Sequence, residues 1–175
     1  MAITYIPIAS SVLGSTSSSI TFSSIPQTYT DLVLKASTRD ANASTNSGQF
    51  IVTFNGDTST TYSQSWLSGA NNATIGSAGY GSNTQINVSN SSMMSGGSTA
   101  NAFAVVEMYI PNYTSTAVRV IYDISASPNM SNNDYEASEG GQYRGGSTIS
   151  SLNVSTNQGG FVAGSRFDLY GIVHF

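Results

Sequence analysis

Apolar and polar residues alternate with a period of two along much of this chain, the pattern of β-strands that bury one face. Residues 49–54 show it clearly, because Phe50, Val52 and Phe54 fall on one side. No window of 11 or more residues shows a convincing helical period of 3.6. The alternation, with the turn residues between the runs, predicts strands at residues 19–25, 29–37, 49–54, 62–67, 84–88, 103–110, 118–125, 148–154 and 166–174.

Turn residues and apolar runs indicate how these strands are arranged. Asn55-Gly56-Asp57 is a strong turn signal, since Asn and Gly accept positive φ. Residues 103–110 form a nearly unbroken apolar run, which predicts a strand covered on both faces, paired as a hairpin with residues 118–125. About eight to ten antiparallel strands with frequent turns predict an all-β, jelly-roll-like sandwich.

The pattern also suggests a simple domain organisation. Residues 1–17, Ser-rich after Pro7, are expected to form an N-terminal arm that could add as a strand to a neighbouring subunit. Residues 18–175 are expected to form a single sandwich domain. Residues 40–48, 71–82 and 129–146 are interpreted as long loops because Gly, Asn and Ser dominate them.

Composition supports the β-class and excludes several functions. Ser, Thr and Asn supply 65 of 175 residues, whereas Asp, Glu, Lys and Arg make up only 8%. With five basic against nine acidic residues, nucleic acid is not an expected partner. The chain has no cysteine, and we expect no signal peptide, no membrane-spanning segment, no metal and no cofactor.

Candidate catalytic groups are few. The single histidine, His174, is interpreted as an outward strand residue or an interface contact rather than a base. Glu107 and Asp123, on neighbouring predicted strands, could form a carboxylate pair of the kind that glycosidases use. A cross-strand ion pair between Glu107 and Arg119 is the preferred explanation for those charges.

A second acidic group lies in the predicted loop 129–146. Glu136 and Glu139 are an alternative carboxylate pair, and with Asp134 they could bind Ca²⁺. Their spacing matches no known calcium loop, so a solvated loop is preferred. We therefore expect a protein that is not an enzyme.

Several large side chains in polar segments are candidate contacts with a ligand or partner. Trp66, Tyr80 and Tyr143 lie in or beside Gly/Asn/Ser segments, as in many carbohydrate-binding faces. Tyr and Trp equally anchor protein interfaces. Met93 and Met94 lie in an otherwise polar segment, residues 89–99, and methionine adapts readily to a partner surface.

Four blocks of sequence carry a resemblance to a known group of proteins. They are residues 19–34 (SITFSSIPQTYTDLVL), residues 54–57 (FNGD) followed by Tyr62-Ser63, residues 109–113 (YIPNY) and residues 161–172 (FVAGSRFDLYGI). In this order, and over nearly the whole chain, they resemble virion structural proteins of tailed bacteriophages. The resemblance implies a jelly-roll-like domain on a capsid or tail, and it implies no catalytic residues.

The resemblance makes a capsid-surface decoration or cement protein the leading hypothesis. Such a protein would lie on the virion surface after assembly in the host cytoplasm, and would bind the major capsid protein lattice as a homotrimer or another small ring. A tail or fibre component that binds a host glycan through Trp66, Tyr80 and Tyr143 is the alternative. A glycan-degrading enzyme is a third hypothesis, which requires two carboxylates in a cleft lined by aromatic side chains.

Overall fold

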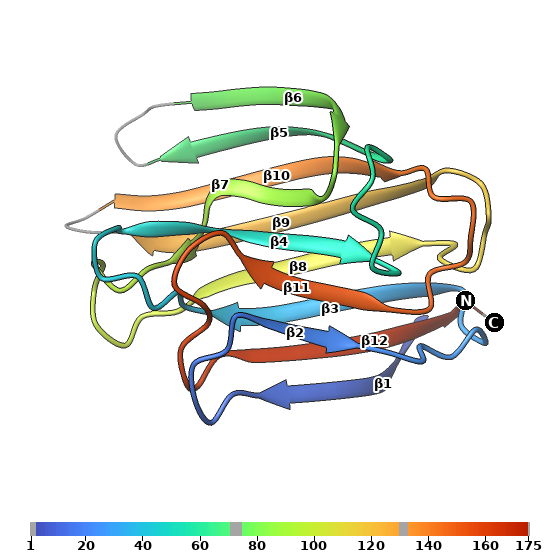
Figure 1. Ribbon diagram of the computed structural model, residues 1–175, viewed down its shortest axis with the longest axis horizontal. Coiled ribbons are helices and arrows are strands. Elements are labelled where there is room, and N and C mark those ends of the chain that lie inside the picture. The colour runs from blue at the N-terminus through green and yellow to red at the C-terminus, as the bar shows by residue number, and fades with distance from the viewer. Residues whose placement is uncertain (1–2, 71–74, 130–132, 175) are drawn as a thin grey trace.

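The computed structural model describes residues 3–70, 75–129 and 133–174, and every helix or strand assigned within them is a β-strand. Twelve strands form two sheets that pack as a sandwich, and every strand pair is antiparallel (Figure 1). The predicted all-β sandwich is confirmed. All nine predicted strands are present, and three further strands, β1, β6 and β10, lie in segments that were expected to be arm or loop.

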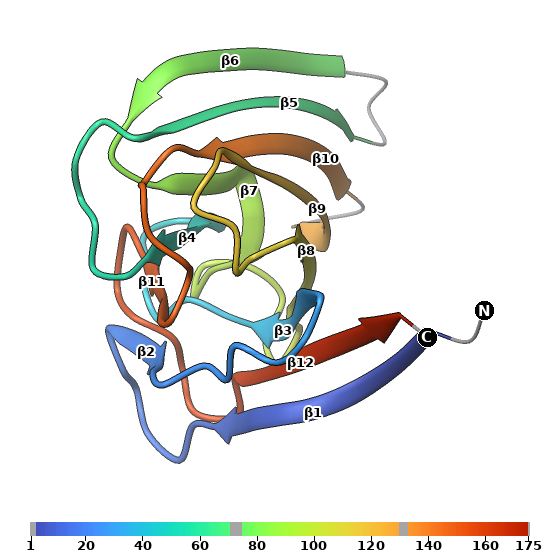
Figure 2. The ribbon, with the colours of Figure 1, turned by 90° about the vertical axis from the view of Figure 1, so that its right-hand side faces the viewer.

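The two sheets differ in size. The larger contains, in spatial order, β1 (Ile3–Val12), β12 (Arg166–His174), β3 (Asp31–Thr38), β8 (Ala104–Pro111), β9 (Arg119–Asn129), β10 (Asn133–Tyr143), β5 (Tyr62–Ala70) and β6 (Ile75–Asn83). The smaller contains β2 (Ser19–Phe22), β11 (Leu152–Thr156), β4 (Ser47–Phe54) and β7 (Ile86–Met94). Figure 2 shows the larger sheet running from β6 at the top to β1 at the bottom, with the smaller sheet to its left.

The chain crosses repeatedly between the sheets, as it does in a jelly roll. Strands β2, β4, β7 and β11 lie in the small sheet, and the strands between them along the chain lie in the large one. When β1, β12 and the β8–β9 hairpin are set aside, the remaining eight strands have jelly-roll order. The additional strands therefore widen only the larger sheet.

Residues 1–17 do not form the expected arm over the part that the structure describes. Strand β1 pairs with β12 from Ile3 opposite His174 to Val12 opposite Arg166. The ladder shifts register between Pro7 and Ala9, and Pro7 interrupts the alternation that would have revealed the strand. Proline is tolerated here because β1 is the outermost strand of the sheet.

Two of the expected loops contain strands whose small residues allow close packing. Strand β6 lies in the segment 71–82 and β10 in the segment 129–146, whose residues 71–74 and 130–132 are outside the described part. A Cβ at Gly76 would lie 3.1 Å from the Trp66 ring, and one at Gly141 would lie 2.9 Å from Ile86 Cδ1. Glycine in these strands thus makes room for a neighbouring side chain rather than marking a loop.

The predicted turn residues behave as expected. Asn55 and Gly56 have φ values of 56° and 67°, and Gly164, just before the last strand, has φ of 86°. The Asn55 side chain also donates to the carbonyl of Thr148 at 2.7 Å and accepts from the Ser150 amide at 2.8 Å. The β4 turn is therefore fixed to the segment that leads into β11.

The core lies between the sheets and is rich in aromatic rings. Inward positions of both sheets contribute to one continuous apolar cluster. The rings form two groups, Phe54 with Tyr62 and Tyr143, and Phe50 with Phe161 and Phe167, with centroids 4.9–6.4 Å apart. Each fully buried ring contributes about 1.5–3 kcal/mol through apolar burial, so the core accounts for much of the stability.

A buried arginine orders the long connection between β7 and β8. The Arg39 guanidinium donates hydrogen bonds of 2.6–3.3 Å to four carbonyl oxygens in that connection, those of Gly96, Ser98, Thr99 and Ala102. The neighbouring Asp40 accepts from Asn42, Ser95, Thr156 and Gly159. This pair of residues ties the connection to the end of β3.

We expect Arg39→Met to lower the free energy of unfolding by about 3 kcal/mol, since partly buried carbonyls lose their donors while the aliphatic stem is kept. Urea unfolding of the purified protein measures the change. The control is Lys35→Met, which removes a half-exposed cation and should cost about 1 kcal/mol or less. Equal losses in the two variants would show that the Arg39 hydrogen bonds are not important for stability.

Candidate functional site

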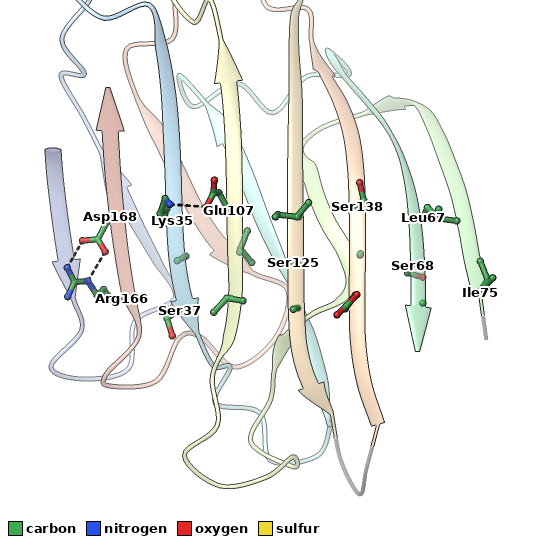
Figure 3. Close-up of a pocket in the computed structure, with 18 residues that line it drawn as sticks. Lys35, Ser37, Leu67, Ser68, Ile75, Glu107, Ser125, Ser138, Arg166 and Asp168 are labelled. Atoms are coloured by element: carbon green, nitrogen blue, oxygen red, sulfur yellow. Dashed lines mark hydrogen bonds and ion pairs between the residues drawn. The ribbon is translucent and has the colours of Figure 1, made fainter. Parts of the chain in front are cut away.

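A groove lies on the outer face of the eight-stranded sheet, away from the core. It encloses about 850 Å³ and crosses seven strands, from β12 at one side to β6 at the other (Figure 3). Side chains that point outward along its length are Lys35, Ser37, Leu67, Ile75, Val105, Glu107, Ile124, Glu136, Ser138, Arg166 and Asp168. We call this surface the outer groove.

Strand alternation explains why these side chains are exposed. In β8, Val106 and Met108 are buried in the core, whereas Val105 and Glu107 point outward. The prediction that residues 103–110 are covered on both faces is therefore wrong. An apolar outward residue such as Val105 makes the run unbroken without any layer covering it, so the run identifies an exposed apolar face.

The floor of the outer groove has apolar side chains on β8 and β9 and again on β5 and β6, with Glu136 and Ser138 of β10 between the two sets. Leu67, Ile75, Val105 and Ile124 are 57%, 78%, 54% and 46% exposed. Val120 and Tyr122 continue the exposed apolar row along β9. Single exposed apolar residues are ordinary on proteins, but several of them on the floor of one groove are typical of a binding surface.

Four of the five charged side chains that line the outer groove form ion pairs with one another, and the fifth is Glu136. Lys35 Nζ lies 3.0 Å from Glu107 Oε2 on the neighbouring strand and 5.3 Å from the centre of the Tyr5 ring. The hydrogen bond to Glu107 raises the pKa of Lys35. The Glu107–Arg119 ion pair expected from the sequence is therefore wrong, because β3, not β9, supplies the partner of Glu107.

A second ion pair lies at the β12 side of the outer groove. Arg166 Nε donates to Asp168 Oδ2 at 2.6 Å and Nη2 donates to Oδ1 at 3.1 Å, which makes a bidentate contact. The Arg166 hydrogen bond lowers the pKa of Asp168. A partner that binds here meets charges that are already compensated, so the cost of removing water from them is moderate.

Three of the five candidate contact residues are not at the surface. Met93 and Met94 lie in β7 and are buried, not in an exposed loop. Tyr143 ends β10 and is buried, with its ring 4.9 Å from that of Tyr62 and 4.6 Å from the guanidinium carbon of Arg119. These side chains take inward positions in β7 and β10 and pack in the core, and the polar residues next to them in sequence take the outward positions.

The other two candidates, Trp66 and Tyr80, lie on the β5–β6 hairpin at one end of the large sheet. In the register, Trp66 is opposite Ala78 and Tyr80 is opposite Gln64, which places both rings on the same face. Trp66 is half-buried and packs against Gly76, whereas Tyr80 is more exposed. This is the face opposite to Leu67, so the two aromatic residues lie outside the outer groove.

The carboxylates are paired differently from the sequence-based expectation. Glu107 points outward and Asp123 points inward, so they do not form a pair. Glu136 and Glu139 lie on opposite faces of β10, which is a strand and not a calcium-binding or solvated loop. Asp123 is instead directly opposite Glu139 across the β9–β10 ladder, a pairing that the predicted loop at residues 129–146 does not contain.

A scan against models of protein families gives no match for this chain, and a search of curated proteins gives none either. The resemblance to phage virion proteins therefore stays a prediction. Among the described residues, no helix is long and apolar enough to cross a bilayer. The same residues contain no group of three or more His, Cys, Asp or Glu side chains that could hold a metal ion.

The positions of the candidate aromatic residues lead to a stability prediction. Tyr143→Ala should lower the free energy of unfolding by about 3–5 kcal/mol, because it removes a buried ring and leaves a cavity. Tyr80→Ala, the same change at an exposed site, should alter it by about 0.5 kcal/mol or less. Chemical unfolding of both variants measures the difference. An unchanged free energy of unfolding in Tyr143→Ala would show that the Tyr143 ring does not contribute to the core.

Proposed function

We propose that this chain is a non-enzymatic structural protein of a tailed-phage particle, and that it attaches to another virion protein through the outer groove. The single observation that supports this proposal best is the set of exposed apolar side chains on the groove floor. The phage assignment is supported by the four resembling blocks of sequence. The leading assignment within that class is a decoration or cement protein on the capsid surface.

The chemistry of the outer groove favours a protein partner. Apolar floor residues gain most from contact with another apolar surface, and the neighbouring ion pairs are already formed within the chain. Lys35 and Glu107 then contribute to the polar rim of an interface rather than to a reaction. A surface with so few charges also gives little protection against aggregation, and a partner that covers part of the surface reduces this risk.

The concave shape of the groove restricts the partner further. A two-fold dimer would place groove against groove and leave empty space between the copies. A convex apolar surface on a different protein, such as a capsid subunit, fills the groove better. We propose that copies associate with each other elsewhere, in a trimer or another small ring, where the outermost strands β1 and β6 offer edges for pairing.

The proposal predicts that Val105→Glu blocks incorporation into virus particles. The new charge would have to be buried at the interface, whereas the free protein keeps its stability because Val105 is exposed. Val118→Glu is the matched control, since Val118 is 53% exposed, compared with 54% for Val105, and does not line the groove. The measurement is the copy number of each variant in purified particles, by quantitative mass spectrometry.

Copy number also separates the capsid from the tail. Hundreds of wild-type copies per particle would support a capsid lattice, and a few to a few dozen would support a tail component. Absence of the chain from purified particles would overturn the virion assignment. Incorporation of Val105→Glu at the wild-type level would overturn the role of the outer groove.

Binding of a host glycan by a tail or fibre component is a second candidate function, favoured by Trp66 and Tyr80 on one face of the β5–β6 hairpin. Aromatic rings that share a face can stack on sugar rings, and Tyr80 is already accessible. Tyr143, the third candidate for glycan contact, is buried and does not lie on this surface.

If this second function is correct, a glycan array should detect a ligand of wild-type protein, and Tyr80→Ala should weaken binding by at least tenfold, about 1.4 kcal/mol. Tyr122→Ala is the control, because it removes an exposed tyrosine from the opposite face of the sheet. Lack of binding at high protein concentration, or equal binding by both variants, would count against a glycan site on the hairpin.

A further inference from the structure

Strand β6 ends the larger sheet and is exposed on both of its faces. None of its nine residues is buried. Figure 2 shows that β6 extends beyond the smaller sheet, whose nearest strand is β7. On one side β6 pairs with β5, and on the other side it presents the row of N–H and C=O groups that every outermost strand has.

Two of the other three outermost strands have features that obstruct the addition of a strand. In β1, Pro7 has no N–H group, and the ladder with β12 shifts register between Pro7 and Ala9. Strand β2 of the smaller sheet has only four residues. Proline, irregular pairing and shortness are among the ways in which native proteins protect sheet edges.

The edge of β7, the remaining outermost strand, is bonded within the chain. Gln64 Nε2 donates to the carbonyl of Asn87 at 2.9 Å, and Gln64 Oε1 accepts from the Asn87 amide at 2.8 Å. Near the other end of β7, the Asp40 amide donates to the carbonyl of Met94 at 2.6 Å. Side chain and backbone of the same chain thus take the place that an added strand would need.

Strand β6 has none of these protections over residues 75–80. That segment contains no proline and no charged residue, and its ladder with β5 is continuous from Ile75 to Tyr80. The register shift of this ladder lies beyond Tyr80, and there Arg144 donates to the carbonyl of Gly81 at 3.2 Å. Residues 75–80 therefore form a regular edge that can accept another strand.

A second copy of this chain is the occupant that the comparison of edges favours. Main-chain pairing requires a partner strand whose own edge is equally open, and of the four outermost strands of another copy β6 meets that requirement. Because β6 carries no charge, two such strands do not repel each other. Identical edges pair about a two-fold axis, and the assembly closes after two copies because both edges are then used.

We propose that β6 pairs antiparallel with β6 of a second copy, so that the two larger sheets join into one sheet in a two-fold dimer. The dimer rests on the self-association in the proposed function, which it makes a ring of two copies, and it does not require the virion assignment. A two-fold axis that relates antiparallel neighbours is normal to the sheet. Both outer grooves then face the same side and stay open to another protein.

The side chains of β6 are compatible with this pairing. An axis normal to the sheet keeps every side chain on its face, so the residue at the axis lies opposite its own copy. With Ala78 at the axis, residues 76–80 overlap, and Tyr80 of each copy lies opposite Gly76 of the other. Trp66 packs on Gly76, where an added Cβ would lie 3.1 Å from its ring, so Tyr80 of one copy reaches Trp66 of the other.

The test measures the association of purified wild-type protein and of Ser77→Lys by sedimentation equilibrium. Ser77 is exposed on β6, and a lysine there places two like charges near the axis. We expect the wild type to form a dimer and Ser77→Lys to raise its dissociation constant by about tenfold or more. The control is Ser138→Lys, which adds the same charge to the same face, opposite Leu67 and two strands from the edge.

A second control examines the opposite end of the sheet. Ser10→Lys adds the same charge to an exposed position of β1 and should leave the dissociation constant at the wild-type value. A dissociation constant raised by Ser10→Lys as much as by Ser77→Lys would overturn the proposal in favour of head-to-tail pairing of β1 with β6. Equal dissociation constants for Ser77→Lys and Ser138→Lys would overturn it as well.

Two readouts on the wild-type protein need no variant. The fluorescence of Trp66, the one tryptophan of the chain, should move to longer wavelength on dilution as its contact with Tyr80 is lost. Hydrogen exchange of β6 amides should speed up over the same dilution, while that of β1 amides does not change. A dimer that dissociates without either change would overturn the β6 contact.

The oligomeric state itself separates this proposal from the virion assignment. A wild-type protein that stays monomeric at its highest soluble concentration, or that forms a trimer, would overturn the β6 dimer. Neither result changes the copy number in purified particles, which tests the virion assignment separately.

Discussion

The eight-stranded sheet is packed on one side only, and this constraint determines most of the molecule. Successive side chains of a strand point to opposite faces, so each residue placed in the core obliges its neighbour to face outward. Strand β8 shows the consequence, since burial of Val106 and Met108 leaves Val105 and Glu107 at the surface. The core and the outer groove are therefore two sides of one sheet, and a change of register in any central strand would disturb both.

A scarcity of charge is the second feature that connects the parts. With five basic residues, the chain uses each one for a specific structural contact, and Arg39 and Arg119 are both turned inward onto backbone carbonyls. The surface is left with few charges and many hydroxyl and amide groups.

The sequence specified the fold class well because alternation and turn chemistry are local signals. All nine predicted strands exist, and Asn55-Gly56 forms the turn that its residue types require. The strands that escaped prediction depend on contacts distant in sequence. Strand β6 places Gly76 beneath Trp66, and β10 places Gly141 beneath Ile86, so their glycines resemble loop residues until the neighbouring strand is known. The site was harder to predict, because whether Tyr143 or Met93 faces the core depends on register rather than on residue type.

The position of β12 has a consequence for how the protein folds. This strand, the last in the chain, lies between β1 and β3, and its partners are more than 120 residues away in sequence. Contacts of such separation form slowly, because the loops that they close are long. Until residues 166–174 have left the ribosome, β1 has no partner in the large sheet and β3 exposes the edge that β12 later covers. We therefore expect the larger sheet to be completed only after β12 has emerged, and chains that stall near residue 165 to associate through the edge of β3.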